Sequence, residues 1–252
     1  MTTTYRRHFI DRRKAEEYDR VQYAPGTYAE IVGELERQQL AAIVEELRRT
    51  HQRIDYLDFA AGTGRIIAFL EDRVDTATGI EISEAMAEQA RSRLHKGRII
   101  CADITAPGAP IEGRYDLITA FRFVLNAEPA LRRDALRALA ARLKDASSVL
   151  VFNNHGNPFS HKLLMWPYHA LRRLGRGYAP EGNYLTNRQA RRLAAAAGLE
   201  IERTLGCAHL SGRSMRFLSY PTVQRLERRL SRARVLGALG AHQMYVARLR
   251  RP

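Results

Sequence analysis

Apolar residues in the first 153 positions follow two alternating patterns. Short, almost continuous apolar runs predict buried strands, and the longer segments between them, where apolar residues return every three or four positions, predict amphipathic helices. We expect strands at Ile54–Ala60, Ala77–Ile82, Arg98–Ala102, Tyr115–Phe121 and Ser148–Asn153, and helices at 27–49, Arg65–Val74, Ser83–Leu94 and Pro129–Leu143. This alternation predicts right-handed crossovers and a parallel, doubly wound sheet.

The pattern is less regular after residue 153. A helix and two further strands are expected at Asn187–Ala197, Leu199–Leu205 and His242–Leu249. Two stretches interrupt them, Asn154–Tyr184 with a short helix near Leu163–Leu174, and Ser211–Gly240 with a basic helix around Val223–Leu236. We therefore expect an α/β fold with a doubly wound, mostly parallel sheet, and a helical and irregular substrate cover inserted in its C-terminal part.

The net charge of +14 is divided unevenly along the chain. Residues 1–153 contain 23 Lys/Arg and 23 Asp/Glu, whereas residues 154–252 contain 18 Lys/Arg and only 4 Asp/Glu. This asymmetry favours an anionic partner near the C-terminal region, such as a phosphorylated substrate, a nucleic acid or a membrane surface. A solvated, arginine-rich surface without a partner is the alternative that charge alone leaves open.

The chain has no apolar run long enough to span a bilayer. Met1–Arg13 has the basic residues of a signal peptide without the apolar stretch that should follow them, so we expect a cytoplasmic protein. Cys101, in a strand that we expect to be buried, and Cys207 fit no metal-ligand spacing. We expect both to be reduced and structural, and we predict no metal site.

A glycine-containing segment, Leu57–Arg65, lies where the first expected strand turns into a helix and reads LDFAAGTGR. Ligands of doubly wound sheets lie outside the carboxyl ends of the strands, and glycines there allow the backbone to approach them. Gly62 and Gly64 fit this role. A dinucleotide fingerprint needs a third glycine, where this chain has Ile67, so the pattern counts against NAD.

The residues Asp58–Arg65 resemble the first motif of the class I S-adenosylmethionine-dependent methyltransferases, an Asp followed by a loop that ends Gly-Thr-Gly-Arg. The resemblance covers roughly residues 50–155, and points to the bacterial small-molecule and glycan methyltransferases. It implies a Rossmann-like fold, S-adenosyl-L-methionine as cofactor and S-adenosyl-L-homocysteine as product. Many relatives carry Gly or Cys where this chain has Ala60–Ala61, and an alanine there should be tolerated if its backbone φ is negative.

This resemblance suggests three functional parts of the chain. Residues 1–50 are expected to form an N-terminal helical segment over the cofactor, and residues 51–153 the S-adenosylmethionine-binding core. Residues 154–252 are expected to complete the sheet and to carry the substrate cover at 154–184 and 211–240.

Acidic residues follow three successive expected strands, at Asp58, Glu81 and Asp103. Glu81 can accept hydrogen bonds from both ribose hydroxyls. The resemblance implies that Ile82 packs on the adenine and that Asp103 lies near its amino group. The predicted cofactor-binding residues are Asp58, Ala60, Gly62, Gly64, Arg65, Glu81, Ile82, Asp103, Ile104, Phe121 and Tyr23.

Two of these assignments rest on position. Phe121, together with Arg122, ends the fourth strand, which should pass under the methionine part of the cofactor. Tyr18, Tyr23 and Tyr28 belong to an N-terminal segment whose aromatic residues cover the cofactor in many relatives, and simple packing is the alternative. Asp116 begins the fourth strand at the wrong edge for binding, so we expect a structural role.

Methyl transfer from a sulfonium is an in-line displacement, which requires mainly that the acceptor be placed correctly. A hydroxyl acceptor also needs a base. His155 follows the fifth strand beside two amides, in the run FNNHGNP, and is our candidate general base, with Arg122 as the second catalytic candidate. A histidine that only caps the strand is the alternative. His161 and His169 are weaker candidates.

We expect O-methylation of a small molecule or glycan, with an anionic acceptor that is phosphorylated or lipid-linked. Base-methylating enzymes often carry Asn/Asp-Pro-Pro-aromatic after the fourth strand, where this chain has Phe121-Arg122-Phe123. An RNA substrate nevertheless stays open because of the arginine-rich region. Quinone C-methylation is another alternative, with peripheral membrane contact through the basic segment Gln224–Arg234. A protein that binds S-adenosylmethionine without catalysis is the alternative from a different class.

Overall fold

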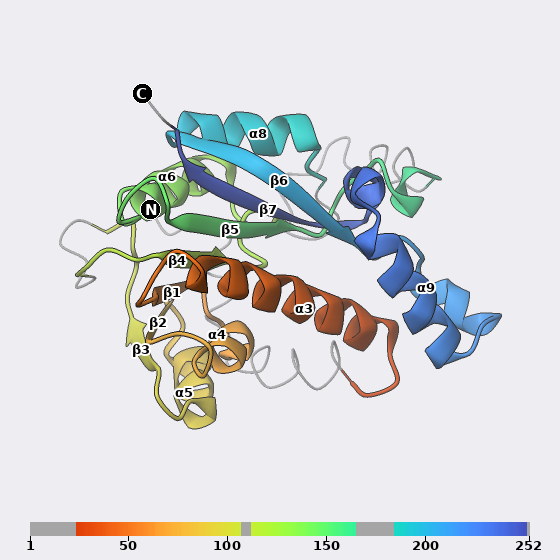
Figure 1. Ribbon diagram of the computed structural model, residues 1–252, viewed down its shortest axis with the longest axis horizontal. Coiled ribbons are helices and arrows are strands. Elements are labelled where there is room, and N and C mark those ends of the chain that lie inside the picture. Colours follow the sequence, from red (N-terminus) through yellow and green to blue (C-terminus); the bar gives the residue numbers. More distant parts are fainter. Residues whose placement is uncertain (1–23, 107–111, 165–183, 251–252) are drawn as a thin grey trace.

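The computed structural model describes residues 24–106, 112–164 and 184–250 and shows one seven-stranded sheet between two layers of helices (Figure 1). The strand order is β3-β2-β1-β4-β5-β7-β6. The strands are β1 (Asp55–Phe59), β2 (Thr76–Glu81), β3 (Arg98–Cys101), β4 (Leu117–Ala120), β5 (Val149–Asn154), β6 (Leu199–Cys207) and β7 (His242–Leu249). Strands β1 to β5 are parallel, and β7 runs antiparallel to β5 and β6. The predicted Rossmann-like α/β fold is confirmed.

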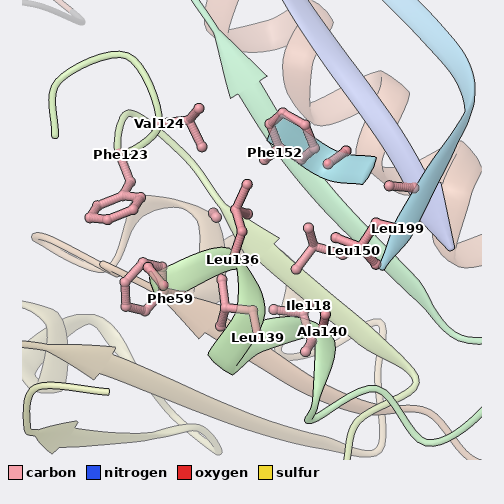
Figure 2. Close-up of a cluster of buried hydrophobic side chains, with 14 of the residues drawn as sticks. Phe59, Ile118, Phe123, Val124, Leu136, Leu139, Ala140, Leu150, Phe152 and Leu199 are labelled. Atoms are coloured by element: carbon pink, nitrogen blue, oxygen red, sulfur yellow. The ribbon is translucent and has the colours of Figure 1, made fainter. Parts of the chain in front are cut away.

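The helices pack on both faces of this sheet because their apolar residues recur at helical spacing. On one face lie α3 (Tyr28–Arg48), α4 (Arg65–Leu70) and α5 (Glu84–Arg93), and on the other α6 (Pro129–Ala140) and α8 (Asn187–Ala196). Figure 2 shows the core under α6 and α8, where Leu136 and Leu139 meet Ile118, Leu150 and Phe152 of the sheet. Alternate residues of the same strands, such as Leu117, Val149 and Val151, face α3 and α4.

The chain reverses its direction of winding between β1 and β4, which are neighbours although β2 and β3 come between them in sequence. Such a switch point leaves a crevice outside the carboxyl ends of the two strands, since the helices that follow them lie on opposite faces. The antiparallel strand β7 begins at this same edge, where Gln243 pairs with Asn154 at the end of β5. Residues from distant parts of the sequence therefore meet there.

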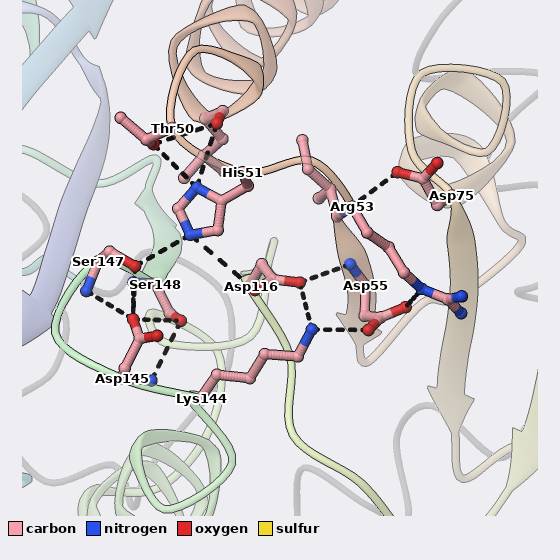
Figure 3. Close-up of polar contacts among 12 residues, drawn as sticks. Thr50, His51, Arg53, Asp55, Asp75, Asp116, Lys144, Asp145, Ser147 and Ser148 are labelled. Atoms are coloured by element: carbon pink, nitrogen blue, oxygen red, sulfur yellow. Dashed lines mark hydrogen bonds and ion pairs between the residues drawn. The ribbon is translucent and has the colours of Figure 1, made fainter.

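The opposite, amino-terminal edge of the sheet carries a polar network (Figure 3). The Nζ atom of Lys144 lies 2.6 Å from Oδ2 of Asp55 and 2.6 Å from Oδ2 of Asp116. Asp116 also accepts a hydrogen bond from the backbone N–H of Asp55 at 2.7 Å. The structural role expected for Asp116 is confirmed.

Three sequence-based predictions need correction. Strand β3 is an edge strand, so Cys101 is exposed and not buried, whereas Cys207 is buried; both cysteines are free. The α4 helix ends at Leu70, four residues before the predicted Val74. The basic helix of the C-terminal part, α9, spans Tyr220–Arg232, earlier than predicted.

Short 3₁₀ helices complete the C-terminal half, namely η1 (His161–Leu164), η2 (Gly212–Arg216) and η3 (Arg234–Leu239). The rest of the short helix expected near Leu163–Leu174 lies outside the described residues, as do Tyr18, Tyr23 and His169. Within the part of the chain that the structure describes, no helix is both long and apolar enough to cross a membrane.

Candidate active site

A cavity of about 1040 Å³, counting the space at its open mouth, lies at the carboxyl ends of β1, β2 and β4. Ten of the thirteen predicted site residues line it: Asp58, Ala60, Gly62, Arg65, Glu81, Ile82, Asp103, Ile104, Phe121 and Arg122. The sequence analysis missed other lining residues, mostly apolar: Phe59, Ile66, Ile80, Met86, Phe123 and Leu131. Their apolar character is the same as that of core residues, so no local signal marks them.

The loop after β1 turns sharply, with three residues in the left-handed region: Ala60 (φ 54°), Gly62 (φ 57°) and Gly64 (φ 84°). Ala60 therefore does not meet the condition of negative φ under which an alanine was expected to be tolerated, and its Cβ costs about 1 kcal/mol. A Cβ on Gly62 would meet no atom within 4 Å, whereas one on Gly64 would lie 2.9 Å from Ala90 of α5. Gly64 thus does not line the cavity but allows α5 to pack closely behind the loop.

Glu81, at the end of β2, holds this loop in place. One carboxylate oxygen accepts the Gly62 N–H at 2.8 Å, and the other accepts the N–H groups of Ile82 and Ser83 at 2.9 Å. Burial raises the pKa of Glu81, although these backbone donors oppose the rise. A carboxylate has about four acceptor sites, so Glu81 can accept a further hydrogen bond from a ligand.

Asp58, at the end of β1, is buried, and only one of its oxygens is paired. Oδ1 accepts a hydrogen bond from Thr119 Oγ1 at 2.6 Å, but Oδ2 has no partner within the described residues. Burial raises the pKa of Asp58 to about 7, and the nearby Glu81 charge adds to this effect. A cationic group entering the cavity would supply the missing partner.

The remaining carboxylate, Asp103, follows β3 and closes a turn, since its Oδ1 accepts the N–H of Thr105 at 2.9 Å and the hydroxyl of Thr105 at 2.7 Å. On the other side of the cavity, Arg122 follows β4 with φ 58°. Its backbone N–H donates to Asn153 Oδ1 at 2.7 Å, and its carbonyl oxygen accepts from Asn126 Nδ2 at 2.6 Å. These two amides fix the strained backbone beside the cavity.

A second polar group, the Glu36 cluster, consists of Glu36, Arg65, Asn153 and His242. Arg65 belongs both to this cluster and to the cavity lining. Glu36 of α3 is buried, and its Oε2 lies 3.5 Å from Arg65 Nη2. Its Oε1 lies 3.4 Å from His242 Nδ1 and 3.4 Å from Asn153 Nδ2. The cluster thus joins α3, β5 and the start of β7 to two residues that line the cavity.

Burial alone would raise the pKa of Glu36, but the hydrogen bond to His242 and the charges of Arg122 and Arg65 hold it well below its usual range. Burial lowers the pKa of His242 to about 4, and Arg122 and Lys162 add to this effect while Glu36 opposes it. Near neutral pH the pair therefore consists of an ionised carboxylate and a neutral imidazole. With Nδ1 facing Glu36, the other ring nitrogen is left to accept a proton.

His155, the predicted base, lies beside this cluster, with its ring centre 6.0 Å from that of His242. Its Nδ1 is buried and has no partner within the described residues. Burial and the positive charges of Arg122 and Lys162 hold the pKa of His155 well below its usual range. Lys162 Nζ donates to the backbone carbonyl of His155 at 2.6 Å, and burial lowers the pKa of Lys162 to about 8.

Comparison with known proteins identifies the domain around the cavity. Residues 57–146 match the family model described as "Methyltransferase domain". Residues 57–146 are therefore a methyltransferase domain. A comparison of the whole chain with curated proteins gives no match.

Solved methyltransferase structures share the fold. A magnesium protoporphyrin IX methyltransferase from Synechocystis PCC 6803, with bound SAH, has a TM-score of 0.63 at 15% identity and covers 97% of this chain and 98% of its own. CalS10, an amino pentose methyltransferase from Micromonospora echinaspora, has a TM-score of 0.55 at 19% identity over 85% of this chain and 90% of its own. KedS8, a sugar N-methyltransferase from Streptoalloteichus sp ATCC 53650, has a TM-score of 0.55 at 16% identity, over 85% and 87%.

Two of the three remaining predicted site residues do not line the cavity, and the third lies outside the described residues. Gly64 lies behind the loop, His155 lies beside the Glu36 cluster, and Tyr23 is outside the described residues. Tyr28 does not cover the cavity either, because its hydroxyl donates to the carbonyl of Leu210 at 2.5 Å and to Glu227 at 2.6 Å.

Glu36 and His242 were missed because they lie 206 positions apart. With the buried Cys207, they offer possible ligand atoms within 4.8 Å of one another, a proximity that no sequence spacing shows. The guanidinium of Arg65 lies 3.5 Å from the same carboxylate, and Arg122 adds a second positive charge. Both positive charges oppose the binding of a divalent cation at these atoms.

Proposed function

We propose that this methyltransferase transfers a methyl group to a hydroxyl group of a small molecule or glycan. The observation that carries the proposal is the His242 imidazole, whose Nδ1 lies 3.4 Å from the buried Glu36 carboxylate, which in turn lies 3.5 Å from Arg65 of the cavity. A hydroxyl is a weak nucleophile and needs a base as it attacks. The Glu36–His242 pair would supply such a base to an acceptor bound at the Arg65 and Arg122 side of the cavity.

The cavity residues fit S-adenosylmethionine in character. Glu81 would accept hydrogen bonds from the ribose hydroxyls, Ile82 and Ile104 would enclose the adenine, and Asp103 would lie near its amino group. The unpaired Oδ2 of Asp58 suits the cationic ammonium of the methionine part. When bound, S-adenosylmethionine supplies the methyl group and leaves as S-adenosylhomocysteine.

Other residues that line the cavity would position the methionine part of S-adenosylmethionine. Ala60, Gly62 and Arg65 belong to the loop and helix start after β1, and Phe121 and Arg122 to the end of β4. Phe121 is buried and presents an apolar wall to the reacting centre. A water-poor cavity strengthens the electrostatic interactions that favour transfer.

His242 is a better base than His155, the candidate from sequence. A base becomes positively charged when it takes the proton, and the Glu36 carboxylate stabilises that charge on His242. Arg122 and Lys162 disfavour the charged form of both histidines, but His155 has no carboxylate bonded to it within the described residues to offset them. We propose that His242 takes the proton from the acceptor hydroxyl and that His155 contacts the acceptor.

The acceptor itself is proposed to be anionic. Arg122 and Lys162 both bring positive charge to the two histidines, and only Glu36 offsets it within the cluster. A phosphate or carboxylate on the acceptor would complete this balance. Amino pentose, sugar and porphyrin methyltransferases among the solved structures support a small-molecule acceptor.

Two measurements, made one after the other, test the proposal. Isothermal titration calorimetry should give a dissociation constant of roughly 1–100 μM for S-adenosylmethionine, and Glu81→Ala should weaken it more than about tenfold. Release of S-adenosylhomocysteine is then followed with a panel of phosphorylated sugars, phenols and amines. Transfer to amines but to no hydroxyl acceptor would contradict the proposed O-methylation, and no cofactor binding would contradict the proposed site.

A further inference from the structure

The exposed, large hydrophobic side chains of the described residues are concentrated in one part of the chain, between residues 159 and 239. They are Phe159, Leu163, Phe217, Leu218, Leu226, Val235 and Leu239. The same region, residues 154–252, carries the whole surplus of positive charge. Apolar exposure and basic charge thus coincide on the C-terminal cover, whereas exposed hydrophobic residues on a surface without a partner are normally scattered.

The most exposed of these side chains flank α9. Phe217 precedes the helix and is 86% exposed, and Val235 follows it and is 85% exposed. Leu218 lies beside Phe217, and Leu239 lies in η3 beyond Val235. The helix therefore has exposed apolar side chains just before its start and just after its end.

Arginines occupy the outward face of α9 between these apolar ends. Residues 208–240 contain seven arginines and a single acidic residue, Glu227. Arg225, Arg229 and Arg232 are exposed and are spaced four and three positions apart, which places them on one face. Arg213 and Arg216 are exposed in η2, next to Phe217.

The inward face of α9 is firmly attached to the rest of the molecule. Glu227 is fully buried and accepts hydrogen bonds from the Tyr28 hydroxyl at 2.6 Å and the Leu210 N–H at 2.6 Å. Glu34 of α3 bonds to Gln224 at 2.6 Å and to Arg228 at 3.1 Å. The one carboxylate of the segment thus has its hydrogen-bond partners inside the molecule. The α9 helix extends beyond the end of the sheet (Figure 1).

We propose that α9 and its flanking segments dock on an anionic membrane surface. The arginines contact lipid phosphates, and Phe217 and Val235 enter the boundary between headgroups and acyl chains. Nucleic acid would also attract the arginines and would stack on Phe217, but it offers no apolar environment to Leu218, Val235 and Leu239. The charge of the surface and its aliphatic residues together favour lipid.

The proposed surface adjoins the acceptor side of the active site. The segment leaves the sheet after Cys207 and returns at His242, and Asn157 donates to the carbonyls of Ala238 and Gly240 at 2.8 and 2.9 Å. A membrane-bound methyltransferase would therefore hold its acceptor end near the lipid. The docking itself does not depend on which acceptor is methylated.

The test is co-sedimentation of the full chain with vesicles of phosphatidylcholine, alone or with about 30% phosphatidylglycerol. The wild type should bind the anionic vesicles at least about tenfold more tightly, and salt should weaken this binding. F217S/V235S should weaken it about tenfold because both apolar contacts are lost. R225S/R229S/R232S should weaken it at least about tenfold, and circular dichroism should show that both variants fold.

The matched control is R133S/R188S/R192S, which removes three exposed arginines from α6 and α8 on the other face of the sheet. It should bind anionic vesicles like the wild type. Equal loss in this control would show that net charge alone governs binding and would overturn the proposal, as would failure of the wild type to bind. Displacement by single-stranded RNA with no effect of F217S/V235S would instead indicate a nucleic-acid surface.

Discussion

The pKa values of charged groups at the two edges of the sheet are shifted by opposite causes. At the amino-terminal edge, Lys144 lies between Asp55 and Asp116, and the pKa of Asp55 falls to about 2 because the hydrogen bonds from Lys144 and its neighbours outweigh the effect of burial. At the carboxyl edge, burial dominates. It raises the pKa of Asp58 to about 7 and lowers that of His242 to about 4.

The difference shows where the molecule leaves room for a ligand. Charges at the amino edge find partners within the chain and contribute to stability. At the carboxyl edge, Asp58 Oδ2 and His155 Nδ1 lack partners within the described residues, so burial disfavours the charged forms of these groups at a cost in stability. Such shifts mark a site whose missing interactions a ligand supplies.

The largest expected effect concerns the base at the carboxyl edge. His242→Ala should lower kcat about 100-fold or more, because it removes the proton acceptor, and should leave the dissociation constant of S-adenosylmethionine unchanged. Steady-state kinetics and calorimetry measure the two quantities. His155→Ala is the matched control and should retain more activity. The opposite ranking of the two variants would move the base to His155.

The pH profile sharpens this assignment. With the base neutral above its pKa, kcat/KM should rise as the pH passes about 4, the pKa of His242. Glu36→Gln removes the carboxylate that raises this pKa, so the rising limb should move to lower pH while kcat falls. A limb that stays in place would show that Glu36 does not act through His242.

At the amino edge, Lys144→Met should lower the free energy of unfolding by about 2 kcal/mol at pH 7, since Asp116 stays buried without its cation. Asp55 has a lowered pKa, so its contribution is present above about pH 4 and lost as the pH falls through about 2. The deficit of the variant should therefore shrink in acid. Arg53→Met removes an exposed partner of Asp55 and should change little; an equal loss would argue against the buried network.

The loop of the carboxyl edge offers a smaller effect. Gly64→Ala should cost about 2 kcal/mol in unfolding free energy, because it adds both a left-handed alanine and a contact of 2.9 Å with Ala90. Gly62→Ala adds only the backbone strain and should cost about 1 kcal/mol. Equal losses in urea denaturation would show that packing against α5 contributes nothing.

The smallest effect should stabilise the protein. Ala60→Gly relieves the left-handed alanine, offset in part by the entropy of glycine, and should add about 0.5 kcal/mol. Ala61→Gly, at the next position and without positive φ, should instead cost about 1 kcal/mol. Thermal unfolding of both variants checks the signs, and destabilisation by Ala60→Gly would contradict the strain at Ala60.

Much of this architecture could be predicted because it is encoded locally. The loop at Gly62 and Gly64 and the carboxylates Glu81 and Asp103 are placed by the strands that they follow, and strand periodicity is visible in sequence. The exposure of Cys101 could not be predicted, because it depends on β3 lying at the sheet edge. Strand order is a property of the whole chain.

The Glu36 cluster could not be predicted for the same reason. Glu36 is one of several acidic residues on an amphipathic helix, and His242 begins a strand with no motif around it. They meet because α3 packs on the sheet and the antiparallel β7 starts at the carboxyl edge. The positive φ of Ala60 could not be predicted either, because it arises from the loop geometry. A glycine at this position would have indicated a left-handed backbone, whereas an alanine does not.

The most direct test of this account is Asp58→Asn, measured for both stability and cofactor binding. Burial raises the pKa of the Asp58 carboxyl to about 7, so its contribution to stability falls as the pH rises from about 4, the unfolded value, to about 7, and the full penalty is present above that pH. At pH 8 the variant should gain about 1–3 kcal/mol in unfolding free energy and should bind S-adenosylmethionine at least about tenfold more weakly. A loss of stability together with unchanged binding would contradict the claim that this edge gives up stability for its ligand.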